Sequence, residues 1–511
     1  MSVTSENNRR IAKNTLLLYF RMLLMMLIAL YTSRVTLQAL GVEDFGIYNV
    51  VGGLVSMGSI FVGAVSIAIQ RFITFELGQR NQQKLNIVFS TSLILQLVAV
   101  IVVLFVFETV GLWFLDNELE IPEARINAAH VIYHFSIFTF CLSLCYLPYN
   151  ACIIAHERMK AFAYMSIIEV VAKLGIVYVI MLDGFDKLIV YGMLLMIIQT
   201  MVVSAYLFYC HRNFEECRLR FTFDRNVVKE MFGYAGWTYI GAGSALLRDA
   251  GGNILINMFY GPVANASRGI AIQVQNAVNQ FATNFMTALN PQITKNYAAG
   301  NYDYMKYLIF NGSRISCYML MFLSLPILLN TEYILQLWLG QQPQYASSFV
   351  RLALLFVFSE AISTPLVTSA SASGKIRNYQ LLVGGLQSLN FPLSWLLLFL
   401  GCPPYITFVV AIIVSQMCLC GRLYILRNMI NLPSRLFIKN VYCNIIVTTL
   451  VGSLLPFIFY LLTDKNLNTF VCSCFLSMLS MGIAIFYVGC NGEERIFIRK
   501  KIKELIRKIH R

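Results

Sequence analysis

Nine charged residues lie inside stretches of sequence that are otherwise apolar enough to cross a membrane. They are Arg21, Glu108, Glu169, Lys173, Arg248, Asp249, Arg268, Arg351 and Glu360. A charge at the centre of a membrane helix costs about 2.5–3.5 kcal/mol even on lenient scales, so such residues face a watery cavity or pair with one another. Glu108 lies near a helix end and can reach the interface instead. The other eight are the candidates for chemistry inside the membrane.

Four of these residues are arginines that predict a binding site for phosphate or an acidic sugar: Arg21, Arg248, Arg268 and Arg351. A guanidinium donates in a planar fork that suits phosphate. The alternative for the same residues is a set of interhelical salt bridges.

The acidic residues suggest other roles. Asp249 and Glu360 are the candidates to carry a proton or Na⁺ for coupling. Glu169 and Lys173 are spaced i,i+4 and can neutralise each other on one helix. Arg248 and Asp249 are adjacent, so we expect them to point in different directions and to find partners elsewhere.

A polar stripe follows one face of the stretch 268–292. Its members recur every three or four residues and are Gln273, Asn276, Gln280, Thr283, Thr287 and Asn290. Amides and hydroxyls bind sugar hydroxyls, so the stripe predicts a cavity wall that contacts sugar. The alternative is interhelical hydrogen bonding.

Enzymatic and metal motifs are weak. His130 and His134 are spaced i,i+4 but have no clear third ligand, so we expect a structural role and no metal. There is no Walker A motif. The acidic stretch Asp116–Glu123 offers the one candidate loop for a membrane glycosyltransferase or ligase. We predict that the protein is not an enzyme and uses no cofactor.

The elements that must position these side chains are membrane helices. Hydrophobic residues make up 58% of the 511 residues and charged residues 13%, which excludes a soluble domain. Windows of about 20 apolar residues predict an all-α polytopic protein with about fourteen spans. They are 15–33, 46–70, 87–113, 128–155, 162–183, 187–209, 233–260, 268–292, 308–330, 346–371, 378–400, 404–426, 440–462 and 467–489.

Basic residues are concentrated in every second loop, so that most of them fall on one side of the membrane. Thirty of the 39 Lys and Arg residues, among them Arg71, Arg314 and Arg422, fall in segments assigned to one side. The positive-inside rule makes that side cytoplasmic, so we expect both termini in the cytoplasm. The net charge of +14 is spread over many short loops and does not indicate a nucleic-acid partner.

The chain repeats itself weakly at an offset of 220 residues. Gly41 falls on Gly261, Ile73-Thr74 on Ile293-Thr294, and Asn81 on Asn301. This predicts two pseudo-symmetric six-helix lobes in parallel orientation, a transporter signature, although chance identity is the alternative. The predicted domains are an N-terminal lobe 1–209, a C-terminal lobe 233–428 and two additional helices in 440–489. A basic amphipathic tail, 493–511, is expected to lie on the inner leaflet.

The segment Ser33–Tyr48 (SRVTLQALGVEDFGIY), the Gly-rich helix after it and Gln70–Glu76 (QRFITFE) resemble the lipid-linked oligosaccharide flippases of bacterial polysaccharide and O-antigen synthesis. These belong to the multidrug/oligosaccharidyl-lipid/polysaccharide exporter superfamily. The resemblance extends to the fourteen-helix layout and so covers nearly the whole chain.

The resemblance implies two lobes around a central cationic cavity. The expected substrate is an undecaprenyl-diphosphate-linked oligosaccharide, moved across the bacterial inner membrane by alternating access while its tail stays among the lipids. Other polysaccharide-assembly proteins are candidate partners. Cavity arginines of the family often come from helices one, two, seven and eight. Here helices one, seven and eight supply Arg21, Arg248 and Arg268, whereas helix two has no charge in its membrane core. The alternative from the same superfamily is an ion-coupled exporter of small cationic compounds.

Overall fold

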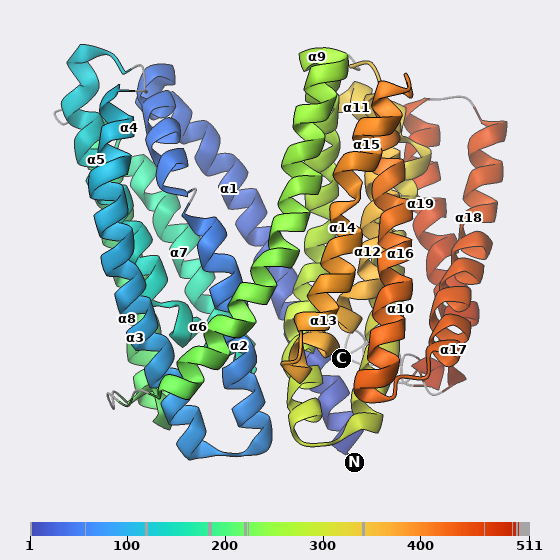
Figure 1. Cartoon of the computed structure of the whole chain (residues 1–511). Coiled ribbons are helices and arrows are strands. Elements are labelled where there is room, and N and C mark those ends of the chain that lie inside the picture. Colours follow the sequence, from blue (N-terminus) through green and yellow to red (C-terminus); the bar gives the residue numbers. More distant parts are fainter. Residues whose placement is uncertain are drawn as a thin grey trace, which may run out of the picture. The chain divides into compact units, whose positions relative to one another are not determined.

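The computed structural model describes residues 3–56, 58–117, 121–181, 186–218, 222, 224–339, 343–463, 466–492, 494–496 and 499. Within these residues the chain is helical and contains no strand. It divides into two compact units (Figure 1). The first comprises Met1–Tyr239 and Thr294–Gly300, and the second Ile240–Ile293 and Asn301–Arg511.

The first unit is built from long helices joined by short turns. Its elements are α1 (Val3–Ser56), α2 (Ser59–Gln79), α3 (Gln82–Val106), the π-helical turn η1 (Phe107–Gly111), α4 (Leu112–Asn117), η2 (Glu123–Arg125), α5 (Ile126–Cys145), α6 (Leu147–Ala155), α7 (Met159–Val179), α8 (Lys187–Asn213) and η3 (Glu215–Cys217). The ends of α9 (Arg225–Ala298) also belong to this unit, and its middle belongs to the second.

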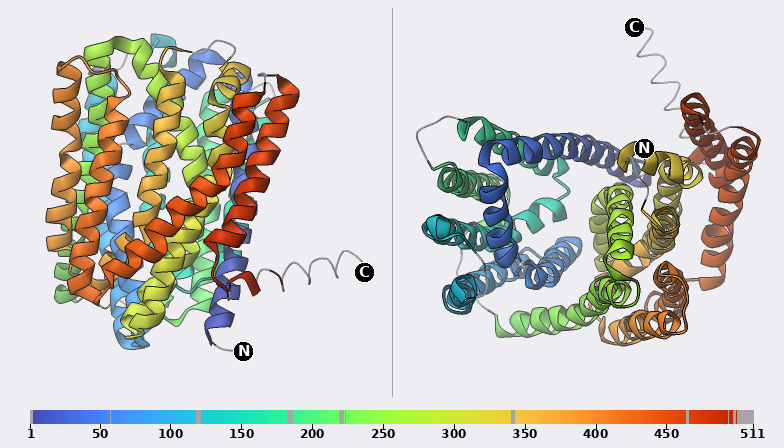
Figure 2. Two further views of the ribbon diagram at one scale, coloured as in Figure 1. Left: turned by 90° about the vertical axis from the view of Figure 1, so that its right-hand side faces the viewer. Right: turned by 90° about the horizontal axis from the view of Figure 1, so that it is seen from above.

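The second unit contains the remaining helices. They are α10 (Tyr302–Leu329), α11 (Thr331–Leu339), α12 (Ala346–Ser373), α13 (Arg377–Tyr379), η4 (Gln380–Gly384), α14 (Gly385–Ser388), α15 (Asn390–Phe399), α16 (Ile406–Ile430), α17 (Ser434–Phe437), η5 (Ile438–Cys443), α18 (Asn444–Leu462), α19 (Leu467–Ala484) and η6 (Ile485–Gly489). The pair α18 and α19 packs together beside α10 (Figure 2).

Eleven helices in the described part of the chain are long and apolar enough to cross a membrane. The other three predicted spans, 46–70, 233–260 and 268–292, are also helical and lie in α1, α2 and α9. These three are the spans that are rich in glycine or polar side chains. The all-α, polytopic fold is therefore confirmed.

The predicted repeat is visible in the backbone. Gly41 interrupts α1 and Gly261 interrupts α9 at positive φ. Arg80 and Gly300 also have positive φ, at the ends of α2 and α9. Each is followed by an asparagine at the start of the next helix, Asn81 before α3 and Asn301 before α10. The two halves of the sequence thus turn at equivalent positions, 220 residues apart, as a repeat requires.

The segment that carried the family resemblance is held by an ion pair. Asp44 of α1 accepts hydrogen bonds from both Nε and Nη2 of Arg125, and Arg125 Nη1 also donates to Asp186 at 2.7 Å. One turn further along α1, Tyr48 packs edge-on against Tyr191, with ring centroids 5.0 Å apart. These contacts tie the start of the second span to α5 and α8.

Three residues assigned to inner loops are instead found within helices. Arg71 lies inside α2, because that helix continues to Gln79. Arg314 lies inside α10 and Arg422 inside α16, and each residue is 4% exposed. Their assignment as loop charges was wrong, because the spans 308–330 and 404–426 already contained Arg314 and Arg422, and α2 continues beyond Arg71. Of the basic tail, only residues 494–496 and 499 are described, so the predicted amphipathic helix lies outside the described residues.

Candidate functional site

A cavity of about 160 Å³, with polar and apolar lining residues, lies within the second unit. Five segments line it: the two halves of α9 on either side of Gly261, and α12, α15 and α16. Its polar lining comprises Arg248, Asp249, Arg268, Gln275, Asn276, Asn390, Ser394 and Thr407, and Phe356, Phe391 and Phe408 are among the apolar residues. The structure thus brings four of the predicted site residues, Arg248, Asp249, Arg268 and Asn276, to one space.

Arg268 is the most enclosed charge of this cavity, at 4% exposed. Its Nη1 donates to Asn253 Oδ1, and its guanidinium carbon lies 5.6 Å from the centre of the Phe408 ring. A Cβ at Gly252 would lie 2.9 Å from Arg268 Nη2, so a glycine there leaves room for the guanidinium. No carboxylate of the described residues forms an ion pair with it. Its buried charge therefore favours an anionic ligand.

Arg248 and Asp249 form a bidentate ion pair. Arg248 Nε donates to Asp249 Oδ1 at 2.8 Å, and Nη2 donates to Oδ2 at 3.0 Å. The expectation that adjacent residues could not face each other was wrong, because the long arginine side chain folds back along the helix to reach its neighbour. The guanidinium also lies over Phe356, 4.9 Å from the ring centre. Asp249 remains 58% exposed at its side chain, so its carboxylate is accessible.

Three buried polar atoms of the cavity lining have no hydrogen-bond partner among the described residues. They are Arg268 Nε, Gln275 Oε1 and Asn390 Oδ1. A buried polar group without a partner costs about 1–3 kcal/mol, so three around one space indicate that something else binds there. One of the three is a donor and two are acceptors. The complementary ligand must therefore offer both acceptors and donors.

Glu360 lies deeper in the same unit. Its carboxylate accepts from Ser415 Oγ, and Ser359 Oγ donates to the same serine at 2.9 Å. Arg248 and Arg422 both interact electrostatically with Glu360. Arg422 Nε donates to Tyr379 Oη at 3.2 Å, whereas its buried Nη1 has no partner among the described residues. Arg422 is thus a buried charge within the predicted span 404–426 that was not among the nine candidates.

Arg21 lies in the first unit, in α1. Its guanidinium carbon is 4.3 Å from the centre of the Phe162 ring, and Glu169 interacts with it electrostatically. Lys173 Nζ donates to Glu169 Oε1 at 2.6 Å, as the i,i+4 spacing indicated. Arg21 Nε is buried and without a hydrogen-bond partner among the described residues.

Arg351 is separated from the cavity. Its Nε donates to the backbone carbonyl of Leu328 at 3.3 Å, and its Nη2 lies 3.4 Å from Glu332 Oε1. It does not line the cavity around Arg268. This environment is the salt bridge that the sequence analysis gave as the alternative.

The polar stripe of α9 is an open face over most of its length. Gln273, Asn276, Gln280 and Thr283 are exposed, and Thr287 and Asn290 are partly buried. The hydroxyls of Thr283 and Thr287 donate to carbonyls of their own helix. Asn290, in contrast, accepts from Thr368 of α12 at 2.8 Å and so forms the interhelical bond of the alternative reading.

The two histidines of α5 pair with carboxylates. His130 lies 3.0 Å from Asp116, and His134 lies 3.0 Å from Glu108. No group of three or more metal-binding side chains with suitable geometry occurs in the described residues.

Comparison with known proteins identifies the family. The sequence profile described as "Polysaccharide biosynthesis protein" matches residues 11–332. The chain belongs to the polysaccharide biosynthesis protein family. That match includes α9, and with it Arg248, Asp249 and Arg268. A search of curated proteins finds no match.

Several solved transporter structures share the fold of this chain. A MATE protein in complex with MaD3S has a TM-score of 0.67 and 13% identity, covering 83% of this chain and 97% of that chain. ClbM, a MATE transporter in complex with Rb⁺, has a TM-score of 0.66 and 13% identity, covering 82% and 95%. A transporter of the MOP superfamily from Pyrococcus furiosus, described as having a binding pocket of reversed polarity, has a TM-score of 0.65 and 14% identity, covering 82% and 96%. This member of the polysaccharide biosynthesis family is thus a multi-pass membrane protein with the fold of the MATE transporters.

Proposed function

We propose that the protein is a flippase of the bacterial inner membrane, with both termini in the cytoplasm. It carries a polyprenyl-diphosphate-linked oligosaccharide from the cytoplasmic to the periplasmic leaflet for cell-surface polysaccharide synthesis. The observation that supports this proposal most directly is the cavity around Arg268, where a buried guanidinium has no carboxylate partner among the described residues. It occurs in a chain of the polysaccharide biosynthesis family.

The unsatisfied atoms of the cavity match a sugar phosphate. Phosphate oxygens accept hydrogen bonds, as Arg268 Nε requires, and sugar hydroxyls donate them, as the oxygens of Gln275 and Asn390 require. A cavity of about 160 Å³ has the volume of about five water molecules. It accommodates a diphosphate or one sugar, and the remaining sugars would lie along the exposed polar face of α9.

The ion pair between Arg248 and Asp249 provides a coupling device. While Asp249 accepts from Nε and Nη2 of Arg248, Arg248 cannot present that edge of its guanidinium to a phosphate. Protonation of Asp249, or Na⁺ bound to its exposed carboxylate, would weaken the pair and release Arg248 for the substrate. Glu360 is the second candidate for this role. The membrane potential adds about 2.3 kcal/mol per charge per 100 mV on the bound anion.

Export of cationic compounds is the second candidate, because the structural neighbours include a multidrug resistance MATE transporter. The cavity lining opposes it, since two arginines and one aspartate leave the space cationic. An organic cation would be repelled by Arg268, which has no carboxylate partner in the described chain.

The test is the sidedness of the lipid-linked oligosaccharide in cells, measured with an impermeant periplasmic label. We expect the intermediate to accumulate on the inner leaflet without the protein and to cross when it is restored. Arg268→Ala should fail to restore crossing at equal membrane abundance, and Lys375→Ala, an exposed loop charge, should restore it. Unchanged sidedness without the protein contradicts the proposal, and cation efflux would then be measured.

A further inference from the structure

A second, more open cavity lies at the N-terminal end of α10, whereas α11 follows the C-terminal end of that helix. Its volume is about 470 Å³, and its lining comes from α10, from the segment Pro433–Asn444 and from the turn after η6. The polar lining residues are Lys306, Tyr307, Asn311, Arg314, Lys439, Asn440, Asn444 and Asn491. No carboxylate is among the described residues that line it. The charge of its loops assigns this end of the unit to the cytoplasmic side.

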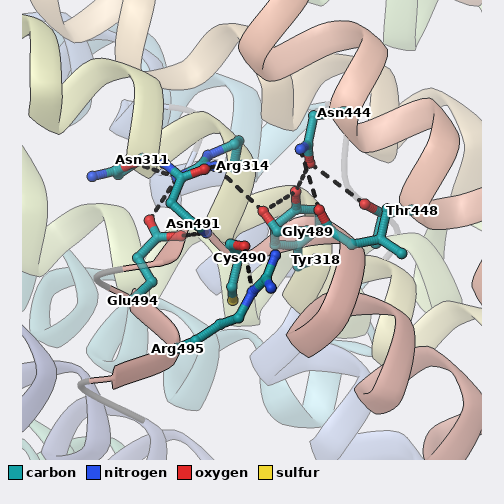
Figure 3. Close-up of polar contacts among 11 residues, drawn as sticks. Asn311, Arg314, Tyr318, Asn444, Thr448, Gly489, Cys490, Asn491, Glu494 and Arg495 are labelled. Carbon is teal, nitrogen blue, oxygen red and sulfur yellow. Dashed lines mark hydrogen bonds and ion pairs between the residues drawn. The ribbon is translucent and has the colours of Figure 1, made fainter.

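Arg314 is one of the lining residues, and both of its terminal nitrogens are hydrogen-bonded (Figure 3). Its Nη2 donates to Asn311 Oδ1 at 2.6 Å and to Glu494 Oε1 at 2.5 Å. Its Nη1 donates to the Gly489 carbonyl and to Asn491 Oδ1, each at 3.3 Å. The second oxygen of Glu494 accepts from the backbone N–H of Asn491 at 2.7 Å. Glu494 therefore neutralises Arg314.

The two lysines of the cavity are not balanced in this way. The Lys306 side chain is only 24% exposed, yet its nearest carboxylate, Asp303, lies 3.9 Å away and is fully exposed. Lys439 in η5 is exposed and has no ion pair among the described residues. Lys306, which is enclosed and has only a distant counter-charge, favours an anion in the space that it faces, and Lys439 adds a second positive charge at the edge of that space.

The surrounding amides add neutral donors. Asn311 and Asn491 both give their side-chain oxygen to Arg314, which leaves their NH₂ groups able to donate to a ligand. Asn440 lies between Lys439 and Asn444 on the same side of the cavity. Two ammonium groups with several amide donors form a set suited to phosphate.

Apolar side chains flank this polar set. Leu436 and Ile438 are exposed beside the cavity, and the face of α18 that begins at Asn444 continues with exposed Val447, Val451 and Leu454. Residues three or four apart share one face of a helix, so an apolar track leads away from the cavity into the bilayer. A soluble phosphate compound would make no use of such a track, whereas an acyl chain would.

We propose that this cavity binds the phosphate head group of an anionic phospholipid from the inner leaflet, with Lys306 and Lys439 as its ligands. Basic pockets between membrane helices on the cytoplasmic side are suited to such head groups. The site is separate from the cavity around Arg268, since the two share no lining residue. The proposed lipid site does not depend on the identity of the transported substrate.

The test is native mass spectrometry of the delipidated full-length protein, titrated with phosphatidylglycerol and, separately, with phosphatidylcholine. We expect preferential retention of phosphatidylglycerol. Each lysine at a membrane surface contributes about fivefold to affinity, so Lys306→Ala with Lys439→Ala should weaken binding on the order of 20-fold. The matched control removes two exposed inner charges outside the cavity, Lys375→Ala with Arg427→Ala, and should change binding less than twofold.

Several results would overturn the proposal. Equal loss in both double variants would show that only net charge matters. Equal retention of the two lipids by the unmodified protein would exclude an anionic head-group site. Saturable binding of inorganic phosphate that depends on the two lysines, without a preference for phosphatidylglycerol, would assign the cavity to soluble phosphate. If the alanine variant unfolds, Lys306→Gln with Lys439→Gln keeps the side-chain bulk and carries the same expectation.

Discussion

Gly41 and Gly261, 220 residues apart, break two long helices with nearly the same backbone conformation. Their φ and ψ angles are 81° and 171° for Gly41, and 75° and −174° for Gly261. This region of φ/ψ space is essentially restricted to glycine. The sequence repeat is therefore a repeat of backbone geometry, and each glycine marks the point where the chain turns between two membrane helices.

Alanine at either turn should strain the backbone. Nothing lies within 4 Å of a Cβ at Gly41 or Gly261, so the cost comes from conformation alone, on the order of 1–3 kcal/mol. We expect a lower melting temperature for Gly41→Ala and for Gly261→Ala in detergent. Gly236→Ala is the matched control, because that glycine is helical and equally open. Melting temperatures no lower than that of Gly236→Ala would contradict the argument.

Asp249→Asn should separate transport from ion coupling. The amide keeps the shape of the side chain but loses the charge that holds Arg248. We expect flipping of a fluorescent lipid-linked oligosaccharide in proteoliposomes to continue and to lose its dependence on an imposed pH or Na⁺ gradient. Glu360→Gln is the comparison. If gradient dependence survives in Asp249→Asn and disappears in Glu360→Gln, Glu360 carries the coupling.

Glu157 holds an ion-pair cluster in the first unit. Its side chain is 1% exposed, and its two oxygens lie 2.8 Å from Arg10 Nη2 and 2.8 Å from Lys295 Nζ. Its φ of 58° is a conformation that few non-glycine residues adopt. Glu157→Gln leaves Lys295 without its counter-charge. We expect the free energy of unfolding to fall by about 2–4 kcal/mol. Most of this loss comes from Lys295, which is mostly buried, since the pair with the half-exposed Arg10 contributes little.

The melting temperature of Glu157→Gln measures this effect. Glu123→Gln, at an exposed carboxylate, is the control and should be unchanged. A melting temperature equal to that of the control would show that the cluster adds no stability.

Glu216, in the loop before α9, should make the stability of the folded protein depend on pH in the acid range. Burial is the largest single influence and would raise the pKa of Glu216. The hydrogen bond with His156, 2.5 Å away, acts together with a backbone hydrogen bond, the electrostatic interaction with His156 and the hydrogen bond from Gln82, and these lower that pKa below its ordinary value of 4.5. A lowered pKa means that the carboxylate stabilises the folded state above about pH 4.5 and that this contribution is lost as the pH falls through the lowered value.

Comparison with Glu216→Gln tests this pH dependence. At neutral pH the variant should melt below the unmodified protein, and the difference should shrink as the pH falls from about 5 to about 3. A difference that stays constant across that range would assign the effect to packing of the loop and not to the charge.

Much of the fold follows from local properties of the sequence. The apolar runs specify membrane helices because each helix satisfies its own backbone hydrogen bonds in the bilayer. Gly41 and Gly261 mark two turns because only glycine adopts their backbone angles readily. The pair Glu169 and Lys173 could be predicted because its i,i+4 spacing on one helix is sufficient to bring the side chains together.

The partners of the charged residues in the candidate site could not be predicted in the same way. Arg248 folds back onto Asp249, Arg351 pairs with Glu332, and Arg422 is buried near Glu360. The sequence determined which residues are charged and in which helix they lie. Only the tertiary structure decided which charges meet, because that depends on the rotation of each helix and on neighbours that are distant in the chain. Arg268 became the centre of the site for this reason: Asn253 and Phe408 come from different helical segments, and only packing brings both to one guanidinium.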